Sequence, residues 1–487
     1  MDVFEARRLT NRIYTRLSAR RPEIDEGERY RDGKQPLTFA TEEWKKANAA
    51  RYADFSDNWC GTVISAEAER LKPTGFAGFD AAGQAWDALQ RNEFDAQFAQ
   101  GVHTALTSRR AYVIVWGDPD NDEPVVTVEH PSNVEIEYNA ENPRRRDAAL
   151  KTWVDEDTEY ATLYTPRQLF KWKRKRFTQK SERESLAEQR KETVAPDGGW
   201  EPRSGDWLDT SWIVPNPLGL VPVVEIQNRP TLKGDPLSEI AGVIPMQNAI
   251  NLLWAYLFLA ADYASMEARV ILSSDPPKIP ILDKDGQPIG SRPVEMKDLR
   301  EKRLLTLSGD NAKIDSWSAA RLDIFTDTIE IAVGHIAAQT RTPPHYLVSN
   351  KGLSNLSGDA LKSAETGLTK KASEFITFAN PALREVARLV LLVQNQQAAA
   401  DEARTARVTW ESPEIRSEAQ MVDALQKKAA IGWPFEALLE EYGYSPAQIE
   451  RILSMRQRDN EALMGVGVQA AVQEGMMLDD VPDADRE

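Results

Sequence analysis

Few side chains in this chain could act as nucleophiles or bind a transition metal. Cys60 is the only cysteine, and the four histidines stand apart at positions 103, 130, 335 and 345. Cys60 has no neighbouring base in the sequence, which predicts a small buried apolar residue rather than a nucleophile. His345, beside Pro344, is the one histidine in a conspicuous place, and we expect it to be structural or solvated. These residues match no Cys/His zinc site, so we predict no metal.

The short motifs of nucleotide and hydrolytic chemistry are also missing. The sequence contains neither G-x-x-x-x-G-K-[ST] nor H-E-x-x-H. Residues 352–356 are similar to G-x-S-x-G, but they lack the final glycine and follow a loop instead of a strand, which is the wrong setting for a nucleophile elbow. We therefore predict no catalytic residue, no cofactor and no enzymatic activity. An acid/base enzyme that uses some of the abundant carboxylates stays open as an alternative.

Charge limits how the chain can meet nucleic acid. It has 60 basic and 76 acidic residues and a formal net charge of −16. This excludes a protein that grips DNA over its whole surface, but not one that handles DNA without gripping it. Residues 171–191 are locally basic around Trp172, which is one pattern of a nucleic-acid patch. Because three glutamates occur within this run, we favour a solvated strand edge and loop.

The remaining compositional features indicate folding in a reducing compartment. A single cysteine cannot form an intrachain disulfide, which is typical of cytoplasmic folding. The N-terminus lacks the apolar core of a signal peptide. The most apolar run, residues 249–261, is shorter than the roughly 20 residues that span a bilayer. We predict a buried helix there and no membrane partner.

Helices are expected first along the chain, and an antiparallel sheet after them. Helical patterns cover residues 3–20, 41–71 and 80–108. Short β-type runs with turn residues between them follow at 111–116, 125–128, 134–138, 150–154, 160–164, 169–172 and 221–226. This order predicts an α+β chain, and its length of 487 residues allows about three domains.

Residues 235–392 form the most informative stretch, in which a small β module separates two helices. The first helix is expected at 237–269; it is apolar nearly all round, and Pro245 should kink or break it. Residues 270–316 contain too many prolines to form a helix. Within this module, β-type runs occur at 278–282 and 303–307.

The second helix, expected at 319–341, has two distinct stripes. Its apolar stripe consists of Leu322, Phe325, Ile329, Val333 and Ile336. Asp323, Asp327 and Glu330 form a separate acidic stripe. Such a stripe is usually a solvated face, but in a channel wall it would repel a passing polyanion.

A glycine and serine loop separates the second helix from a third. Pro343 and Pro344 end the second helix, and the loop extends to Asp359. The third helix is expected at 360–397 with a kink at Pro381. The remaining chain to residue 478 is expected to be mostly helical, before an acidic, disordered end.

Four groups of residues occur in an order that resembles the portal proteins of tailed bacteriophages. No single group is specific, but the ordered set covers nearly the whole chain. The resemblance implies an α+β portal fold with wing, stem, clip and crown regions, assembled as a dodecameric ring with an axial channel. The groups are residues 55–61 with 66–71, 216–224 with 227–230, 238–251, and 342–347 with Ser354, Asn355 and 410–413.

The resemblance implies a division of the chain into regions. In chain order these are the wing at 1–236, a wing-to-stem helix at 237–270, the clip at 271–317, a second stem helix at 318–341, a tunnel loop at 342–359, a long wing helix and return strand at 360–409, a helical crown at 410–478 and an acidic tail at 479–487.

The function that the resemblance implies is structural. The ring would stand at one capsid vertex of the virion, and double-stranded DNA would be packaged and ejected through it. The terminase large subunit and later a head-completion or adaptor protein would dock on it, and the major capsid protein and scaffold would surround it. The chain would be made in the host cytoplasm.

The resemblance also implies which residues meet the DNA. The loop residues that would face it are Asn350, Lys351, Ser354, Asn355, Ser357 and Lys362, and the stem residues that would line the channel are Asp323, Asp327 and Glu330.

Two other functions stay open at this point. One is a metal-dependent DNA-processing enzyme that uses acidic residues, whose activity would be lost when two or three carboxylates are changed. The other is a nucleic-acid-binding module centred on residues 171–190, which predicts salt-sensitive DNA binding by the monomer.

Overall fold

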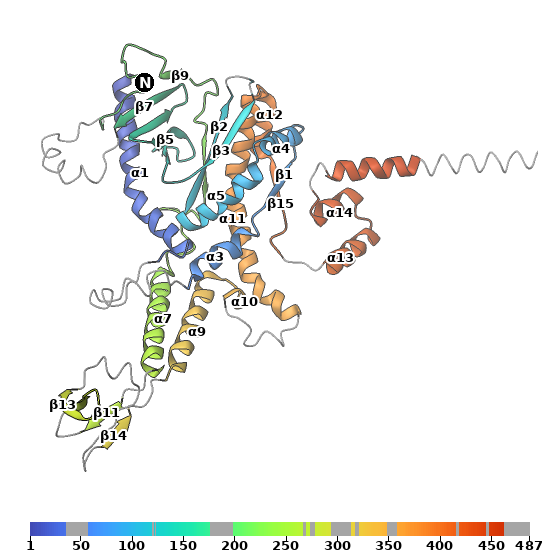
Figure 1. Ribbon diagram of the computed structural model, residues 1–487. Coiled ribbons are helices and arrows are strands. Elements are labelled where there is room, and N and C mark those ends of the chain that lie inside the picture. Colours follow the sequence, from blue (N-terminus) through green and yellow to red (C-terminus); the bar gives the residue numbers. More distant parts are fainter. Residues whose placement is uncertain are drawn as a thin grey trace, which may run out of the picture. The chain divides into compact units, whose positions relative to one another are not determined.

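The computed structural model divides into two compact units (Figure 1). Unit 1 comprises Met1–Gln35, Asn58–Gln247 and Gly334–Glu487, and unit 2 comprises Pro36–Asp57 and Asn248–Val333. The residues that the structure describes are 1–35, 57–118, 121, 123–175, 198–265, 269–272, 278–293, 313–316, 321–347, 358–414, 418–444 and 448–461.

The N-terminal helices are confirmed in type but not in extent. Helix α1 (Val3–Arg31) is longer than the expected 3–20 and begins with a capping box between Asp2 and Glu5. Of the helix expected at 41–71, the structure describes residues from 57 onward, and α3 (Trp59–Ala68) lies there. The single helix expected at 80–108 is wrong: α4 (Ala82–Arg91) and α5 (Phe94–Ser108) are separate. Glu93 between them has a φ of 54°, which a continuous right-handed helix does not allow.

A six-stranded antiparallel sheet holds one hydrophobic core of unit 1. Its order is β4-β5-β6-β7-β8, and β9 also pairs with β7. Phe170, Trp172, Trp200 and Trp212 are buried against α1, which runs along this sheet (Figure 1). The strands are β4 (Val134–Tyr138), β5 (Arg146–Asp155), β6 (Thr158–Tyr164), β7 (Gln168–Lys175), β8 (Glu201–Pro202) and β9 (Ile213–Pro215).

Two smaller sheets join distant parts of the chain within unit 1. A three-stranded antiparallel sheet has the order β10-β2-β3, with β2 (Arg110–Gly117), β3 (Pro124–Glu129) and β10 (Val223–Gln227). A two-stranded sheet pairs β1 (Pro73–Ala77) with β15 (Arg407–Trp410). The expected strands in this part of the chain and their antiparallel pairing are confirmed, whereas the β1–β15 pair was not predicted.

Helix α11 (Gly358–Val393) is the longest element of unit 1 and agrees well with the helix expected at 360–397. It contacts β2, β10, α3 and α4, and its buried face includes Leu368, Phe375 and Val386. The short helix α10 (Pro344–Leu347) precedes it. The elements that follow are α12 (Gln397–Glu402), a 3-10 helix at Ala403–Thr405, α13 (Glu418–Ala430) and α14 (Phe435–Tyr442).

The described part of unit 2 consists mainly of α7 (Ile244–Ser265) from residue 248 onward, α9 (Asp323–Thr340) up to residue 333, and the strands between them. The first helix was expected from residue 237, with a kink or a break at Pro245. The expected start is wrong, because α7 begins at Ile244, and Pro245 marks the start of the helix and not a kink within it. Pro245 therefore lies in the first turn, where its missing N–H leaves no helical hydrogen bond unmade.

The segment between α7 and α9 is a β module, as the sequence predicted. β11 (Arg269–Leu272) pairs with β14 (Lys313–Ser316), and between them β12 (Lys278–Leu282) pairs with β13 (Pro288–Pro293). The expected β-type run at 303–307 lies outside the described residues. The chain thus leaves unit 1 along α7 and returns along α9 (Figure 1).

Candidate functional site: helices α7 and α9 and two buried charge clusters

The acidic stripe of α9 lies on an exposed face of the helix. Asp323, Asp327 and Glu330 are all exposed, whereas Ile329 and Val333 are buried. Arg321 hydrogen-bonds to Asp323, and this bond lowers the pKa of the Asp323 carboxyl below its usual value. The predicted separation of an acidic from an apolar stripe is therefore present in the folded helix.

Helix α7 is apolar, but a single chain covers it poorly. The window Ile244–Ala261 has a mean hydropathy of 1.2, and 33% of it is buried. By length and composition this window could cross a membrane, although core helices of soluble proteins pass the same test. Tyr256, in the middle of the helix, is 40% exposed. The helix expected to be buried is thus only partly buried within the chain itself.

The predicted DNA-facing loop lies almost wholly outside the described residues. This holds for Asn350, Lys351, Ser354, Asn355 and Ser357. The sixth predicted residue, Lys362, belongs to α11 and follows the first residue of that helix by four positions. The structure describes the two helices that flank the loop, α10 and α11.

A cluster around Arg70 ties both flanking helices to α3. We call Arg70, Glu365, His345 and Tyr346 the Arg70 cluster. Arg70 pairs with Glu365 of α11, and its Nη2 donates to the hydroxyl of Tyr346 in α10 over 3.1 Å. His345 Nε2 lies 2.8 Å from Glu365 Oε1. His345 is therefore structural, which is one of the two alternatives that the sequence analysis expected for it.

A second cluster of charges is buried deeper, where α7 begins and α9 ends. Its members are Glu67 of α3, Arg229 and Glu239 before α7, and Lys371 of α11, which we call the junction. Lys371 Nζ lies 2.8 Å from Glu67 Oε2 and 2.5 Å from Glu239 Oε2. Arg229 Nε lies 2.8 Å from Glu239 Oε1. Two positive and two negative groups balance one another, as buried charges require.

The junction also binds backbone and amide groups of neighbouring segments. Lys371 Nζ donates to the carbonyl oxygen of Thr340, the last residue of α9, over 3.1 Å. The side-chain amide of Asn228 donates to Glu239 Oε1 over 2.8 Å. Glu239 also donates its backbone N–H to the carbonyl of Leu106 at the end of α5. Four segments of unit 1 therefore meet at one buried lysine.

Burial shifts the proton affinity of one junction carboxyl strongly. Desolvation raises the pKa of Glu67 from 4.5 to about 7, although the neighbouring Lys371 opposes the shift. The nearby carboxylate of Glu239 adds to the increase. The Glu67 carboxyl therefore takes up a proton at a higher pH than an exposed glutamate does.

Sequence reasoning singled out His345 but predicted none of the ion pairs of the two clusters. One signal was available: Lys371 stands at helical spacing among Leu368, Ala372 and Phe375, all of which are buried. A charged residue at a core position of an amphipathic helix needs a buried partner. Glu67, which follows buried Cys60, Val63 and Ile64 on one face of α3, gives the same signal.

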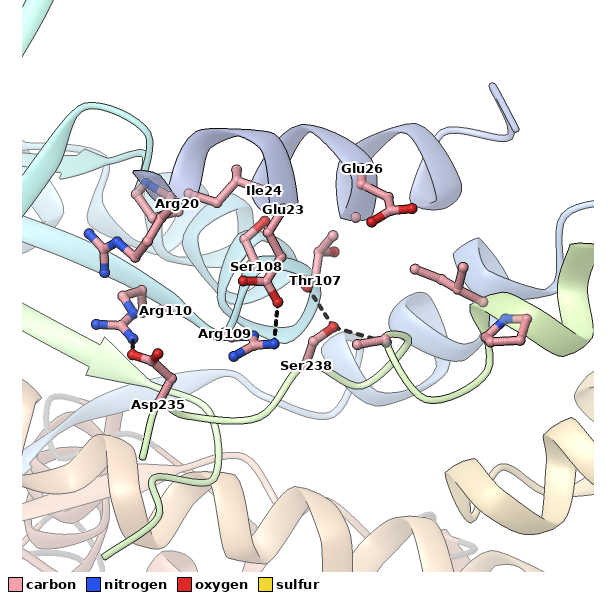
Figure 2. Close-up of a pocket in the computed structure, with 15 residues that line it drawn as sticks. Arg20, Glu23, Ile24, Glu26, Thr107, Ser108, Arg109, Arg110, Asp235 and Ser238 are labelled. Carbon is pink, nitrogen blue, oxygen red and sulfur yellow. Dashed lines mark hydrogen bonds and ion pairs between the residues drawn. The ribbon is translucent and has the colours of Figure 1, made fainter. Parts of the chain in front are cut away.

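A pocket of about 280 Å³ lies beside the junction, between α1, the end of α5 and the segment that leads into α7 (Figure 2). Arg109 pairs with Glu23, and Arg110 Nη2 lies 2.5 Å from Asp235 Oδ1. Three arginines and three carboxylates line the pocket, so it lacks the surplus positive charge of a nucleic-acid site. These residues are Arg20, Arg109, Arg110, Glu23, Glu26 and Asp235.

The basic strand β7 is built into the sheet, contrary to the expected solvated edge. It pairs with β6 on one side and with β8 and β9 on the other. Trp172 is fully buried, and the guanidinium of Arg174 lies over the rings of Tyr14 and Trp200, at 4.1 and 4.2 Å from their centroids. Residues 176–197 of the basic run lie outside the described residues.

The side chain of Cys60 behaves as the sequence predicted. It is fully buried, and this burial raises the pKa of its thiol to about 12, so the reactive thiolate is suppressed. Among the residues that the structure describes, no group of three or more His, Cys, Asp or Glu side chains is placed to hold a metal ion.

Comparison with known proteins identifies the family. Residues 11–462 match the family model of phage portal proteins of the SPP1 Gp6-like type. The chain belongs to this portal family. Its α+β portal fold and its structural portal function, both predicted from the sequence, are thereby confirmed. The portal proteins of Mycobacterium phages D29 and L5 are each 26% identical to it, over 423 and 422 residues; each match covers 83% of this chain and 79% of the relative.

Solved structures of phage-like particles show a weaker likeness. A chain in the virion of the native gene transfer agent particle has a TM-score of 0.44 and 12% identity, covering 85% of this chain and 90% of that one. A chain in the neck of the native particle computed with C12 symmetry has a TM-score of 0.43 and 14% identity, covering 88% and 99%. Family membership rests on the family model, which places this portal protein in the virion.

Proposed function

We propose that this portal subunit assembles into a ring of twelve copies at one capsid vertex and that double-stranded DNA is packaged and ejected through the ring's axial channel. The observation that carries the proposal is the family match over residues 11–462. The subunit has no enzymatic activity of its own and is made in the host cytoplasm. The terminase large subunit and later a head-completion or adaptor protein dock on the ring, which the major capsid protein and scaffold surround.

The proposed regions follow the elements of the fold. The wing is residues 1–236, the stem is the helix pair α7 and α9, and the clip is the β module at 271–317. The long wing helix is α11, with β15 as its return strand. The crown at 410–478 begins with the end of β15 and contains α13 and α14.

The surface of α7 supports an assembled state. A helix without a charged side chain between Ile244 and Ala261, of which 33% is buried, leaves apolar surface in water when the chain is alone. In a closed ring each subunit presents one face to the next copy and the opposite face to the previous one. The stem helices of neighbouring subunits would cover this surface, and no additional helix or strand would be needed for it.

The acidic stripe of α9 suits the wall of a DNA channel. Asp323, Asp327 and Glu330 place negative charge on an exposed face, and twelve copies would surround the channel with it. Like charges repel the phosphate backbone and prevent it from adhering while it moves. The residues that would approach the DNA are Asn350, Lys351, Ser354, Asn355 and Ser357 in the loop and Lys362 in the first turns of α11.

The first test is the mass and symmetry of the purified chain, measured by native mass spectrometry and negative-stain class averages. We expect a ring of about twelve subunits with a central hole. A chain that stays monomeric at all concentrations, and also in the presence of capsid protein and scaffold, would contradict the proposal.

A further inference from the structure

The two faces of the six-stranded sheet in unit 1 are covered unequally. Helix α1 runs along one face, where Trp172 and Trp200 are buried (Figure 1). The opposite face packs against the three-stranded sheet through Tyr164 and Leu169, near one end of β6 and β7. Toward the other end of these strands, most side chains on this opposite face are only half-buried. We call this area the open face; it consists of Trp153, Tyr160, Thr162, Lys171, Lys173 and Arg203.

Three cations meet on the open face. Lys171 and Lys173 are two residues apart in β7, so both side chains lie on the face opposite to that of Trp172. Arg203 donates its backbone N–H to the carbonyl of Lys171 over 3.0 Å, which continues the ladder between β7 and β8 and places the two residues side by side.

These cations lack the partners that a sheet usually gives to charged side chains. None of the three forms an ion pair in the part of the chain that the structure describes, although Glu201 is opposite Lys173 in the ladder. Like charges that face each other on neighbouring strands destabilise a sheet. The fold therefore does not require Arg203 beside Lys171, whereas a bound anion would make the pair favourable.

The guanidinium of Arg203 is held in a fixed position. It lies over the rings of Trp153 and Tyr160, at 4.9 and 5.6 Å from their centroids, and its Nη2 donates to Thr162 Oγ1 over 3.2 Å. Its Nε is buried without a hydrogen-bond partner. Burial lowers the pKa of this guanidinium below its usual value, because the charge loses hydration. A guanidinium fixed in this way is preorganised to bind a carboxylate or phosphate group.

The open face fits a short acidic segment better than a nucleic acid. The rings of Trp153 and Tyr160 stack on each other, with centroids 5.6 Å apart, and Arg203 lies over both, so their faces are already in contact and offer no platform for bases. The affinity for duplex DNA grows with the number of phosphates neutralised, and three cations on a chain with a net charge of −16 neutralise few. A segment with as many carboxylates as the face has cations matches it in charge.

We propose that the open face is a docking surface for a short acidic segment of another virion protein. Arg203 binds one carboxylate through its remaining N–H groups, and Lys171 and Lys173 bind the carboxylates next to it. The proposal rests on the proposed portal function, which surrounds the subunit with other virion proteins, and it extends that function by naming a surface and the chemistry of its partner.

The test is the binding of a short fluorescein-labelled peptide, in which glutamate and leucine alternate, to the assembled full-length protein. Fluorescence anisotropy at low salt measures the affinity. Lys171→Gln/Lys173→Gln should weaken binding by about tenfold or more, because it removes two charge-assisted hydrogen bonds. The matched control is Lys233→Gln/Lys370→Gln, which removes the same charge from two exposed positions and should leave the affinity unchanged. Equal affinities of all three proteins, or no binding to the parent, would overturn the proposal.

A second variant separates docking from folding and from net charge. The two lysines have no ion-pair partner to lose, so Lys171→Gln/Lys173→Gln should keep the melting temperature of the parent. Arg203→Lys keeps the charge but not the planar guanidinium, and it should also weaken peptide binding, by a smaller factor. Full peptide affinity in Arg203→Lys would mean that only net charge matters, and it would overturn the proposed site.

A short duplex DNA tests the competing class of ligand. We expect the parent and Lys171→Gln/Lys173→Gln to bind it alike. A loss of DNA binding as large as the loss of peptide binding would assign the open face to nucleic acid, or to anions of any kind, and would overturn the proposal.

Failure of the portal function is visible separately. If the parent protein forms no ring by native mass spectrometry, the proposed function fails whatever the peptide does. If the parent forms a ring and the peptide binds equally to the parent and to Lys171→Gln/Lys173→Gln, only the docking surface fails.

Discussion

The sheets of unit 1 and the helix pair of unit 2 use apolar residues in opposite ways. In the six-stranded sheet the largest side chains, such as Trp172 and Trp200, are fully buried within one chain. In the helix pair, large apolar residues such as Ile331, which is 63% exposed, remain at the surface of the isolated chain. The sheets therefore fold around their own core, whereas the helix pair needs a partner to remove its apolar surface from water.

The largest expected effect tests the self-sufficiency of the sheets. Trp172→Ala should lower the free energy of unfolding by about 3–5 kcal/mol, because it empties the centre of a fully packed core. Tyr256→Ala on α7 should change the unfolding of the single chain by less than about 1 kcal/mol. Urea unfolding of both variants at a concentration where the ring is dissociated measures the difference. Equal losses would mean that α7 belongs to the same core.

The next effect concerns the junction, whose four charged residues all lie in unit 1. The pKa of Glu67 rises from 4.5 to about 7 on folding, so the folded state binds more protons than the unfolded state between these values. The free energy of unfolding should then fall as pH rises from about 4.5 to about 7, by on the order of 3 kcal/mol in total. Urea unfolding at several pH values should show this slope in the parent and its loss in Glu67→Gln.

The matched control for that experiment is Glu69→Gln, at an exposed position two residues further along the chain. It should keep the pH dependence of the parent. A slope that survives in Glu67→Gln would assign the proton uptake to another group.

A smaller effect is expected at the N-terminus of α1, which covers the six-stranded sheet. Glu5 donates its backbone N–H to Asp2 Oδ1 over 2.7 Å, and the Glu5 side chain accepts from the backbone of Asp2. Asp2→Ala should cost about 1 kcal/mol, whereas Asp2→Asn keeps an acceptor and should cost less. Thermal unfolding ranks the three proteins. Equal melting temperatures would show that packing alone holds the end of α1.

The smallest effect on stability, but one with a functional signal, is expected on α9. Changing Asp323→Asn, Asp327→Asn and Glu330→Gln together should alter the free energy of unfolding by about 0.5 kcal/mol or less. The assembled protein should then retain duplex DNA more strongly at low salt, as measured by fluorescence anisotropy. The control triple Asp155→Asn, Glu156→Gln and Asp157→Asn, at the end of β5 and in the turn that leads to β6, should not. Equal retention by both triples would exclude a specific role for the stripe.

Local sequence patterns predicted most helices and strands, whereas the pairing of segments that are distant in the sequence could not be predicted. The strands β2 to β7 follow from alternating apolar residues and turn residues, which depend only on neighbours in the sequence. The pairing of β1 with β15 joins Pro73 to Trp410, and no local pattern carries that information. The break between α4 and α5 depends on one residue, Glu93, whose type does not favour a left-handed backbone.

The exposed residues of the candidate site could be predicted from the sequence, whereas its buried contacts could not. The acidic stripe of α9 could be read from spacing alone, because exposure leaves the helical period visible. The partners of Lys371 come from α3, from the segment before α7 and from α9, so their meeting depends on the tertiary fold. Helical spacing indicates that Lys371 and Glu67 are buried, but it does not indicate which residues they contact.

The charge balance at the junction also constrains how this sequence can diverge. A neutral substitution at Glu239 leaves one positive charge in excess at the junction, and one at Lys371 leaves one carboxylate in excess, so each single step passes through a poorly folding intermediate. Viable descendants should change these positions in sets whose charges sum to zero. Among relatives as distant as 26% identity, positions 67, 229, 239 and 371 should therefore vary as one unit or not at all.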